Sequence, residues 1–588
     1  MNAKRGVPSP ARALRRRLVR MLVCALLAGT GVLGACGRDL PAEPQARSAA
    51  PGGAPAMDLY DNPLCQEPPG TVHPGDAITA NEQWDASGNP HHVTGTIHVH
   101  DGARLRLLPG TLVCFESQAG IRADQGGWLV VDGDATARVV LTALHLSPGW
   151  DGISLHGTPA ASSSLMNTLV EYVGFGTAVH AQDRHVARLD SVHIRQAGNA
   201  VTLYSPQSRI VRSWVDTTTS LAVLMGDSTR FEHTVVRGAG GVGVRVVGTS
   251  GVLLIGGRIE GSADVGVRVE HSGAVSGGDA IRITGGSSYP LDVPVDALSR
   301  MYGTAEEQDS LLGNARDTLY VRGGTLTSWV YAVAGLPWRV TGHLTISTDG
   351  QLRTQPGALF VVQAPWRITA QNGGRLLARG AHGAPVRFTA ADSTLGWAGI
   401  LLEDAPTSAS YLTNAHVEYV PLISALFARD NHKVVVDSTV FRRVGQAVAL
   451  ASPGSRIIRS RIDSTTVTGM AAVELASTAW LESTLIRGAA DMGILVHTST
   501  ARVVSCEIRD SGGDAIYLGP SGAAAVHNCN LVNNAGYGIN NGSLTSADAT
   551  NNWWGDAAGP SGPNGDGAFG ALSYTPWRTT PYVLPYVP

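Results

Sequence analysis

Two phrases of the sequence combine a carboxylate, an imidazole and a cation: AQDRHVAR at 181–188 and ARDNHKVV at 428–435. They align at a numbering offset of 247, and each keeps an Asp two positions before a His, Asp183 with His185 and Asp430 with His432. In such a pair the Asp could orient the His as a general base, while Lys433 or an Arg stabilises the enolate that forms. The alternative is a polar turn between strands that was copied with its surroundings.

The acidic residues do not form the pairs that cleavage of a glycosidic bond requires or the clusters that bind a metal ion. Cleavage of a glycosidic bond needs two carboxyl groups, but SGGDAI at 276–281 and at 511–516 supplies one acid each, Asp279 and Asp514. In VDGD, Asp132 and Asp134 have Arg379 and Ala381 as counterparts at the same offset, so no group of acids recurs. We predict no metal site and no cofactor.

Several tryptophans are candidates for stacking against sugar rings. Trp150 and Trp397 match between the two phrases GWDGISL and GWAGILL, and an inward or cap-packing ring is the favoured interpretation for both. Four tryptophans have no such partner and are the better candidates for glycan binding: Trp128, Trp214, Trp366 and Trp480.

Four cysteines lie outside the N-terminal region, and their spacing fits no zinc motif. Cys65 and Cys114 could join the first residues of the folded part to the segment that follows. Cys506 and Cys529 occupy the same place in successive copies of a short repeat. In-register neighbours of this kind could form a disulfide or a ladder of buried thiols.

The elements that must position these residues come from a sequence that repeats on two scales. Residues 90–173 align with 337–420 without a gap, and about 32 of these 84 positions are identical. We interpret this as a tandem duplication. Within each half, apolar residues recur every 21 to 24 positions: Ile194, Val215, Val236 and Ile259, then Phe441, Ile462, Ile486, Ile508 and Leu531.

Each short repeat contains alternating apolar runs joined by Gly, Ser, Asp or Asn, a pattern typical of strands and turns. A unit of this length cannot bury its own apolar side, whereas stacked units can. The leucine-rich pattern L-x-x-L-x-L-x-x-N is missing, and a propeller blade needs nearly twice the length. The sequence therefore predicts an all-β, right-handed parallel β-helix solenoid that is tandemly duplicated.

The phrases LRLLPGTLVCF, GGWLVVDG, GWDGISL and LVEYV, with NNWWG at 551–555 and YTPW at 574–577, resemble right-handed parallel β-helix repeat proteins of bacterial surfaces. The resemblance covers roughly residues 90–580 and implies the pectate-lyase-like solenoid fold. That fold hosts lyases, hydrolases, epimerases, adhesins and spacers, so it implies no single function. The Asp-x-His phrases resemble the Asp-Pro-His phrase of alginate C5-epimerases, but both copies lack the proline.

The N-terminal region has the features of an export signal. Arg12 to Arg20 supply a positive stretch, MLVCALLAGTGVLGA follows at 21–35, and LGAC at 33–36 resembles the lipobox of bacterial lipoproteins. That resemblance implies cleavage before Cys36 and lipid on this residue, so we expect an exported protein anchored to a membrane, at the outer membrane or cell surface. Ordinary signal cleavage with a chance cysteine is the alternative.

The predicted organisation has six parts: a lipoprotein signal peptide at 1–35, a flexible Pro- and Ala-rich tether at 36–69, a first β-helix at 70–285, a connector at 286–336, a second β-helix at 337–548 and a cap at 549–588. The cap would contain Trp553, Trp554 and Trp577, whose rings would seal the open end of the solenoid.

Composition limits the choice of partner. The chain contains 44 Lys and Arg against 47 Asp and Glu, and removal of residues 1–35 takes away seven basic and no acidic residues. The remaining net charge near −10 argues against a nucleic-acid partner. We expect a non-catalytic binding or structural surface, for example for a polysaccharide or another envelope component. A lyase or C5-epimerase acting on acidic glycans is the alternative, and a passive spacer is a third class.

Overall fold

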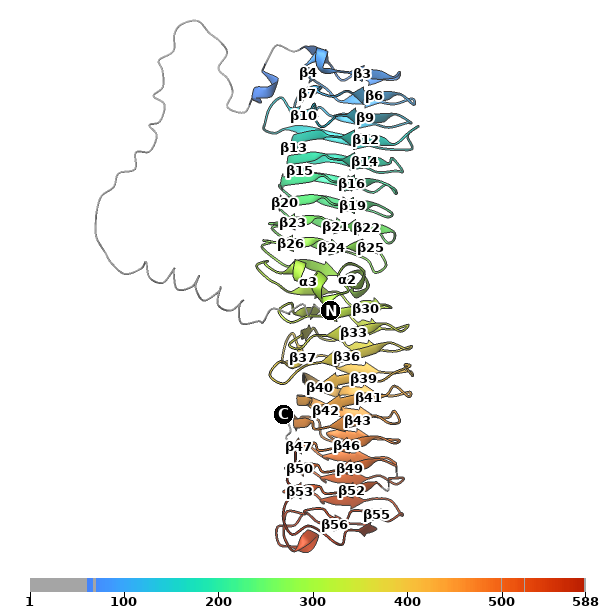
Figure 1. The fold of residues 1–588 in the computed structure, drawn as a ribbon, viewed down its shortest axis with the longest axis vertical. Coiled ribbons are helices and arrows are strands. Elements are labelled where there is room, and N and C mark those ends of the chain that lie inside the picture. The colour runs from blue at the N-terminus through green and yellow to red at the C-terminus, as the bar shows by residue number, and fades with distance from the viewer. Residues whose placement is uncertain (1–60, 67–69, 499, 523, 586–588) are drawn as a thin grey trace, which may run out of the picture. The chain divides into compact units, whose positions relative to one another are not determined.

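Each short repeat folds as one coil of three strands, and successive coils stack by parallel strand pairing. The structure is a computed structural model that describes residues 61–66, 70–498, 500–522 and 524–585. The predicted leader, Cys36 and the tether up to residue 60 lie outside the described residues. We name the three strands of a coil a, b and c in chain order, and the stacked strands form columns a, b and c (Figure 1).

The first half contains three columns. Column a consists of β1 (Thr71–His73), β4 (His91–Val93), β7 (Leu112–Phe115), β10 (Val139–Ala143), the first parts of β13 (Thr168–Ala181) and β15 (His193–Leu203), β17 (Trp214–Thr218), β20 (Val235–Ala239), β23 (Arg258–Glu260) and β26 (Arg282–Thr284). Column b consists of β2 (Ala77–Ile78), β5 (Ile97–Val99), β8 (Ile121–Ala123), β11 (Trp150–Leu155), the last parts of β13 and β15, β18 (Val223–Met225), β21 (Val244–Val246), β24 (Val267–Val269) and β27 (Leu291–Val293). Column c consists of β3 (Glu82–Trp84), β6 (Arg104–Leu107), β9 (Trp128–Asp132), β12 (Ser163–Met166), β14 (Ala187–Asp190), β16 (Arg209–Val211), β19 (Arg230–Glu232), β22 (Val252–Ile255) and β25 (Val275–Asp279).

The second half repeats this arrangement. Column a consists of β28 (Leu319–Val321), β31 (Trp338–Val340), β34 (Leu359–Val362), β37 (Val386–Ala390), the first parts of β40 (Ala415–Ala428) and β42 (Val440–Leu450), β44 (Arg461–Thr465), β47 (Leu485–Arg487), β50 (Glu507–Arg509) and β53 (Asn530–Val532). Column b consists of β29 (Gly324–Leu326), β32 (Leu344–Ile346), β35 (Ile368–Ala370), β38 (Ile400–Leu402), the last parts of β40 and β42, β45 (Val473–Leu475), β48 (Ile494–Val496), β51 (Ile516–Leu518), β54 (Ile539–Asn541) and β56 (Ala568–Phe569). Column c consists of β30 (Trp329–Ala332), β33 (Gln351–Thr354), β36 (Arg375–Arg379), β39 (Ser410–Thr413), β41 (Val434–Asp437), β43 (Arg456–Ile458), β46 (Trp480–Glu482), β49 (Arg502–Val504) and β52 (Ala525–His527), and β55 (Ala547–Asp548) pairs with β57 (Leu572–Ser573) beyond it.

The interior is built from the apolar residues that recur along the sequence. Ile194, Val215, Val236 and Ile259 are direct register partners in neighbouring coils and are fully or almost fully buried. The five apolar residues from Phe441 to Leu531 stack in the same way in the second half. Burial of each such side chain contributes about 1.5–3 kcal/mol, so the repeated apolar position stabilises every coil.

A single left-handed residue turns the chain from column c into column a in most coils. Its φ lies between 43° and 62° in the following residues: Asn167, Ser191, Arg212, His233, Gly256, Asn414, Ser438, Arg459, Ser483, Ser505, Asn528 and Asn551. Asn and Gly reach this conformation most easily, and five of these twelve residues are Asn or Gly, while four are Ser.

The two halves have matching elements at the offset found in the sequence. β13 and β40 each contain 14 residues, and each has a register shift, between Val173 and Thr177 in one and between Val420 and Ser424 in the other. β15 and β42 each contain 11 residues. The aligned residues therefore occupy equivalent places in the fold.

The segment predicted as a connector contributes to the stack. It contains α2 (Val295–Met301), α3 (Ala305–Gln308) and the 3-10 helix η3 (Asp309–Leu311), together with strands from β27 to β30. β27 of column b pairs with β28, which begins column a of the second half, so the strand ladder continues through the junction. Tyr302 follows α2, is fully buried, and donates its hydroxyl hydrogen to the carbonyl of Ile281 at 2.6 Å.

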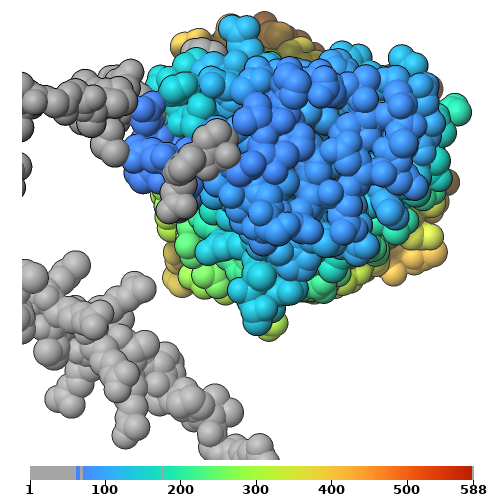
Figure 2. All heavy atoms as spheres, turned by 90° about the horizontal axis from the view of Figure 1, so that it is seen from above, coloured from blue at the N-terminus to red at the C-terminus, as the bar shows by residue number. Residues whose placement is uncertain are grey.

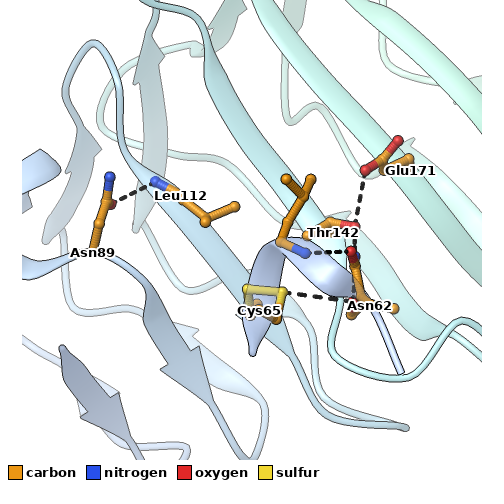
Figure 3. The surroundings of a disulfide bond; sticks show 9 residues. Asn62, Cys65, Asn89, Leu112, Thr142 and Glu171 are labelled. Atoms are coloured by element: carbon orange, nitrogen blue, oxygen red, sulfur yellow. Dashed lines mark hydrogen bonds between the residues drawn. A yellow bond between two sulfur atoms is a disulfide. The ribbon is translucent and has the colours of Figure 1, made fainter. Parts of the chain in front are cut away.

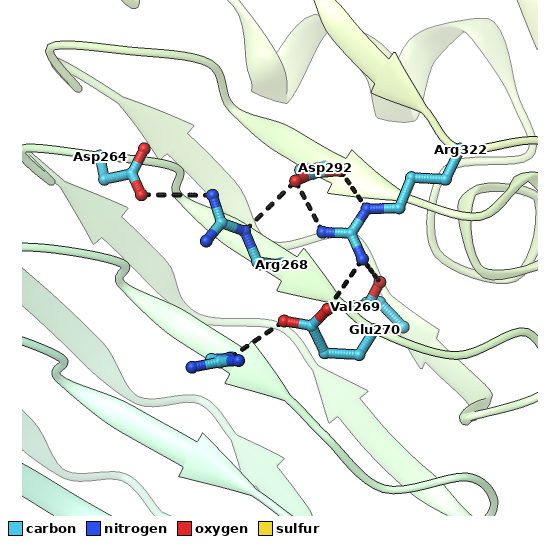
Figure 4. A network of polar contacts seen from close by, with 7 residues as sticks. Asp264, Arg268, Val269, Glu270, Asp292 and Arg322 are labelled. Atoms are coloured by element: carbon cyan, nitrogen blue, oxygen red, sulfur yellow. Dashed lines mark hydrogen bonds and ion pairs between the residues drawn. The ribbon is translucent and has the colours of Figure 1, made fainter. Parts of the chain in front are cut away.

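An ion-pair network holds the junction together (Figure 4). Arg322, the residue after β28, donates to both carboxylate oxygens of Asp292 at 2.5 and 2.7 Å and to Glu270 at 2.9 Å. Arg268 donates to Asp292 and Asp264, each at 3.2 Å. The hydrogen bonds from Arg322 to Asp292 and then to Glu270 raise the pKa of Arg322 further above its usual range, so the guanidinium is a permanent link between the halves.

The N-terminal end of the stack is covered by the first coils, whose blue atoms form a continuous surface in Figure 2. Trp84 is 3% exposed and stacks on His73 and His91, with ring centroids 3.8 and 5.2 Å away. A disulfide joins Cys65, in the 3-10 helix η1 (Pro63–Cys65), to Cys114 of β7 (Figure 3). Asn62 donates to Thr142, and Thr142 donates to the buried Glu171.

The C-terminal end is closed by the predicted cap residues. The Trp554 side chain is fully buried and Trp553 is half-buried, while Tyr574 and Trp577 pack against the core. The chain between them contains the 3-10 helix η4 (Gly559–Ser561), and the Trp577 ring lies directly over Gly559. The backbone of residues 576–578 bonds to Asn551 and Asn552, so this segment returns to the last coil.

Candidate functional site

The two Asp-x-His phrases form turns before β14 and β41. His185 and His432 are fully buried, and each ring lies between a serine hydroxyl and a carbonyl oxygen. Nε2 lies 2.7 Å from Ser163 Oγ in the first half and 2.8 Å from Ser410 Oγ in the second. Nδ1 lies 3.0 Å from the carbonyl of His156 and 3.1 Å from that of Glu403.

These partners determine the hydrogen positions on each ring. A carbonyl oxygen only accepts, so Nδ1 carries the hydrogen and Nε2 accepts from the serine hydroxyl. The serine oxygens in turn accept from the backbone N–H of Leu129 and Leu376. Burial lowers the pKa of both imidazoles. Each His therefore acts as a neutral structural link between coils.

The general-base hypothesis for these phrases is not supported by the geometry. Asp183 and Asp430 are exposed left-handed residues that contact neither His185 nor His432, and Lys433 is an exposed residue next to the buried His432. A group that removes a proton must reach its substrate within hydrogen-bonding distance, and both imidazoles lie inside the turn with each ring nitrogen occupied. The polar-turn interpretation describes these residues better.

The isolated acids also have structural surroundings. Asp132 pairs with Arg106, and Asp134 accepts from the backbone and side chain of Thr136 in its own turn. Asp514 accepts from the backbone of Tyr537 and from Asn540. Asp279 is exposed at the end of β25 in column c, whereas Asp514 lies just before β51 in column b. The structure therefore brings together no two of these carboxylates.

Column a carries a ladder of alternating charges that inspection of single repeats does not reveal. Glu171, Arg195, Asp216, Arg237 and Glu260 are register partners in successive coils. Arg195 donates to the buried Glu171 at 2.6 Å, and Arg237 donates to Glu260 at 3.1 Å. Because each charge has an opposite neighbour, this row is largely neutralised. Knowledge of the coil register would have revealed it from the sequence.

Cys506 and Cys529 are free, buried thiols. They occupy positions that Thr439, Ser460 and Thr484 occupy in preceding coils, and Asn552 follows them at the same spacing. Burial is the largest cause of the raised pKa of Cys506. The structure therefore has the ladder of buried thiols, which is one of the two alternatives predicted from the sequence. These turn positions hold small, weakly polar side chains.

The tryptophans fall into distinct environments. Trp150 and Trp397 are inward, as predicted, and each indole N–H donates at 2.8 Å to a backbone carbonyl, that of Glu171 or Glu418. Among the four candidates for glycan binding, Trp128 is a half-buried residue of β9, and Trp366 packs against the core beside His343. Trp480 lies between the guanidinium groups of Arg456 and Arg502, which cover its ring.

Trp214 differs from the other three candidates. Its side chain is 45% exposed at the start of β17, and it borders a cavity of about 380 Å³ that opens to solvent. The other lining residues come from the turns between columns c and a and from β15: Asp134, Ala135, Thr136, Arg138, Asn167, Thr168, Ser191 and His193.

The cavity combines an aromatic wall with polar groups of several kinds. His193 precedes Trp214 by one coil and pairs with Asp216 at 2.6 Å. The exposed Arg138 has no hydrogen bond or ion pair within the described part of the chain. An indole face for the apolar side of a sugar, with donors and acceptors around it, is the composition expected of a carbohydrate site.

This cavity belongs to the first half alone, because its side chains are not kept in the second. The counterparts of Asp134, Arg138, His193 and Trp214 in the second half are Ala381, Pro385, Val440 and Arg461. Sequence analysis selected Trp214 but missed its neighbours. The spacing between His193 and Trp214 was a usable signal, since it equals one coil.

The residues that the structure describes contain no helix suited to cross a membrane and no cluster suited to hold a metal ion. No helix in this part of the chain has the length and apolar character to cross a membrane. Within the same residues, no group of three or more His, Cys, Asp or Glu has an arrangement that could hold a metal ion.

Comparison with known proteins agrees with the fold. Residues 398–553 match the family model described as the right handed beta helix region. No curated protein matches the chain. Together with the stacked parallel coils, the match identifies the chain as a right-handed parallel β-helix repeat protein. This class supports a polysaccharide-related role and no finer assignment.

Proposed function

We propose that this protein is an exported, lipid-anchored component of the cell envelope whose β-helix binds a polysaccharide at the Trp214 cavity. The observation that carries the proposal is the exposed Trp214 ring beside Arg138 and His193, in an open cavity on a rigid stack of strands. Export and lipid on Cys36 rest on the sequence of the leader.

The ligand expected from this cavity is a chain of sugars with acidic groups. The indole would stack on a sugar ring, and Arg138 would pair with a carboxylate of the ligand because it has no partner in the described residues. Asp134, Asn167 and Thr136 would accept or donate hydrogen bonds to hydroxyl groups. Strand ends and short turns hold these groups, so binding requires little ordering of the protein.

The test is a measurement of binding to a panel of neutral and uronate-containing polysaccharides by titration calorimetry. Trp214→Ala should weaken the binding found for the wild-type protein by about tenfold or more, since loss of one aromatic contact costs about 1 kcal/mol beyond the lost contact area. Arg138→Gln should weaken binding to the uronate polymers more than to the neutral ones.

A matched control is Trp329→Ala, because Trp329 is 43% exposed but lies in β30, outside this cavity. Equal loss of binding in both variants, or unchanged binding in Trp214→Ala, would contradict the proposed site. Absence of binding to every polymer would favour the passive-spacer class.

The alternative function, a lyase or C5-epimerase centred on Asp430, His432 and Lys433, has no supporting geometry. Its separate readout is the formation of unsaturated product by absorbance, or of inverted uronate residues by NMR. A His432→Gln variant that lost such an activity while keeping its melting temperature would support the alternative.

A further inference from the structure

A second open cavity, of about 480 Å³, lies on column b of the first half. It is lined by residues of four successive coils, among them His98, Arg122, Asp151 and Ser154. The Asp151 carboxylate is exposed and has no hydrogen bond or ion pair in the described residues. The cavity is separate from that of Trp214, with which it shares no lining residue.

Ser154 lies between this cavity and a histidine. Ser154 and His156 are two positions apart on β11 and the residue after it, so both side chains leave the strand on the same side. Ser154 Oγ lies 2.5 Å from His156 Nε2. This is the contact that a nucleophilic hydroxyl makes with its general base.

His156 is held from its other ring nitrogen by the next coil. Nδ1 lies 2.7 Å from Gln182 Nε2, the side-chain amide nitrogen, and 3.6 Å from Asp183 Oδ2. The nitrogen and oxygen of an amide side chain exchange places by a flip. After such a flip, the Gln182 oxygen accepts from Nδ1–H, the Asp183 carboxylate lies beside it at 3.6 Å, and Nε2 is free to take the serine proton.

The residues on either side of Ser154 are donors. Arg122 of β8 and His180 of β13 are its direct register partners in the neighbouring coils. Adjacent strands lie about 4.8 Å apart, so both side chains lie beside Ser154. Arg122 donates from Nε to Asp124 at 2.8 Å, which leaves its other N–H groups for an oxygen bound at the Ser154 hydroxyl. Donors in this position stabilise the negative oxygen of a tetrahedral intermediate.

The second half keeps the fold of this region and loses its chemistry. Leu401 stands in the place of Ser154, Glu403 in that of His156, Thr369 in that of Arg122 and Phe427 in that of His180. The corresponding cavity is lined mainly by apolar residues, including Ile400, Leu401 and Leu422. The fold therefore does not require Ser154, His156 or Arg122 at these positions.

We propose that Ser154, His156 and Asp183 form a hydrolytic site for acyl esters. Ser154 Oγ attacks the ester carbonyl carbon while His156 Nε2 takes its proton, and Arg122 and His180 donate to the carbonyl oxygen. The bond to the alcohol oxygen then breaks, the alcohol leaves with the proton from His156, and the acyl group stays on Ser154. Water attacks this ester, His156 again takes and returns a proton, and a carboxylic acid leaves with the serine restored.

The class of substrate inferred for this site extends the polysaccharide-binding function proposed above and depends on it. The cavity is open and polar, and Arg122 and His98 are among its lining residues, so an O-acetyl or similar small acyl ester on an acidic polysaccharide fits its chemistry. Asp183, selected from the sequence as a partner of His185, is here a positioning residue for His156.

The experiment uses a fluorophosphonate probe, which labels activated serines, and p-nitrophenyl acetate as an ester that needs no polysaccharide. The wild-type protein should be labelled on the peptide that contains Ser154. Ser154→Ala should abolish the labelling, and His156→Gln should reduce it and the esterase rate by about a hundredfold or more. Asp183→Asn should give a smaller loss with a displaced pH profile, and Asp183→Glu should recover part of the rate.

The matched control is Ser164→Ala, which removes a half-buried strand serine of β12 that has no histidine partner in the described residues. It should be labelled and active like the wild type. Labelling of the wild type elsewhere than at Ser154, or an unchanged esterase rate in Ser154→Ala, would overturn the proposal. The esterase rate is measured on an ester without polysaccharide and polysaccharide binding is measured without an ester, so failure of this site and failure of the polysaccharide site give different results.

Discussion

Replacement of Trp554 by Ala should open the C-terminal end of the stack. The side chain is fully buried, its ring centroid lies 6.1 Å from that of Tyr574, and its edge lies close to Gly538. A buried Trp→Ala change removes about 3–5 kcal/mol. In a solenoid each coil depends on its neighbours, so the loss should be concentrated in β53, β54 and β56.

The assay is amide hydrogen exchange followed by mass spectrometry, with light scattering to detect oligomers. Exchange in Trp554→Ala should accelerate in residues 530–578 and stay unchanged in the first half, and the open strand edge should promote association. Trp554→Phe is the matched control, because it keeps most of the ring area and removes an indole N–H that has no partner in the described residues. Its cost should stay below about 1.5 kcal/mol. Equal exchange in the wild type and Trp554→Ala would refute the cap.

Three further predictions concern the junctions and turns. Replacement of Cys65 and Cys114 by Ser should destabilise the attachment of residues 61–66 by about 4 kcal/mol, estimated from the sequence separation of 49. Limited proteolysis should then cleave the variant in residues 61–66. Resistance to proteolysis equal to that of the wild type would contradict this prediction. Arg322→Met should lower the free energy of unfolding by about 2 kcal/mol, since charged hydrogen bonds to Asp292 and Glu270 are lost. Urea unfolding measures this change. An unchanged unfolding midpoint would show that the network adds no stability. Burial lowers the pKa of His185 and His432 in the folded protein. Their contribution to the free energy of unfolding is therefore complete at pH values above the ordinary imidazole pKa of 6.5, and it is lost as the pH falls through the pKa of the folded state. Melting temperatures measured from pH about 7 to about 5 should fall less steeply in the His185→Gln, His432→Gln double variant than in the exposed-residue control His271→Gln, and parallel curves would contradict the assignment.

The fold was accessible from the sequence because its main determinant is periodic. The interval between apolar positions such as Ile194 and Val215 equals one coil, and the structure pairs these residues directly. The inward positions of Trp150 and Trp397 followed from the repeated phrase around them. The closure of the N-terminal end by Trp84 stacked with His73 and His91 was missed, because these residues belong to no repeat.

Candidate sites were harder to predict because they depend on contacts between coils. The distance of two positions from Asp183 to His185 suggested a pair, whereas the turn buries His185 and directs Asp183 toward His156 of the preceding coil. Likewise, Trp214 was identified by its residue type, but Arg138 reaches the same cavity from a turn three coils earlier. Such neighbours become visible once the register of the coils is known.

Binding of polysaccharide at the Trp214 cavity is tested most directly by a hydrogen-exchange footprint of the wild-type protein with and without a bound uronate polymer. We expect slower exchange in the turn at 134–138 and in residues 191–218, with little change in the second half, where Arg461 replaces Trp214. Protection confined to the second half, or spread evenly over both halves, would contradict it.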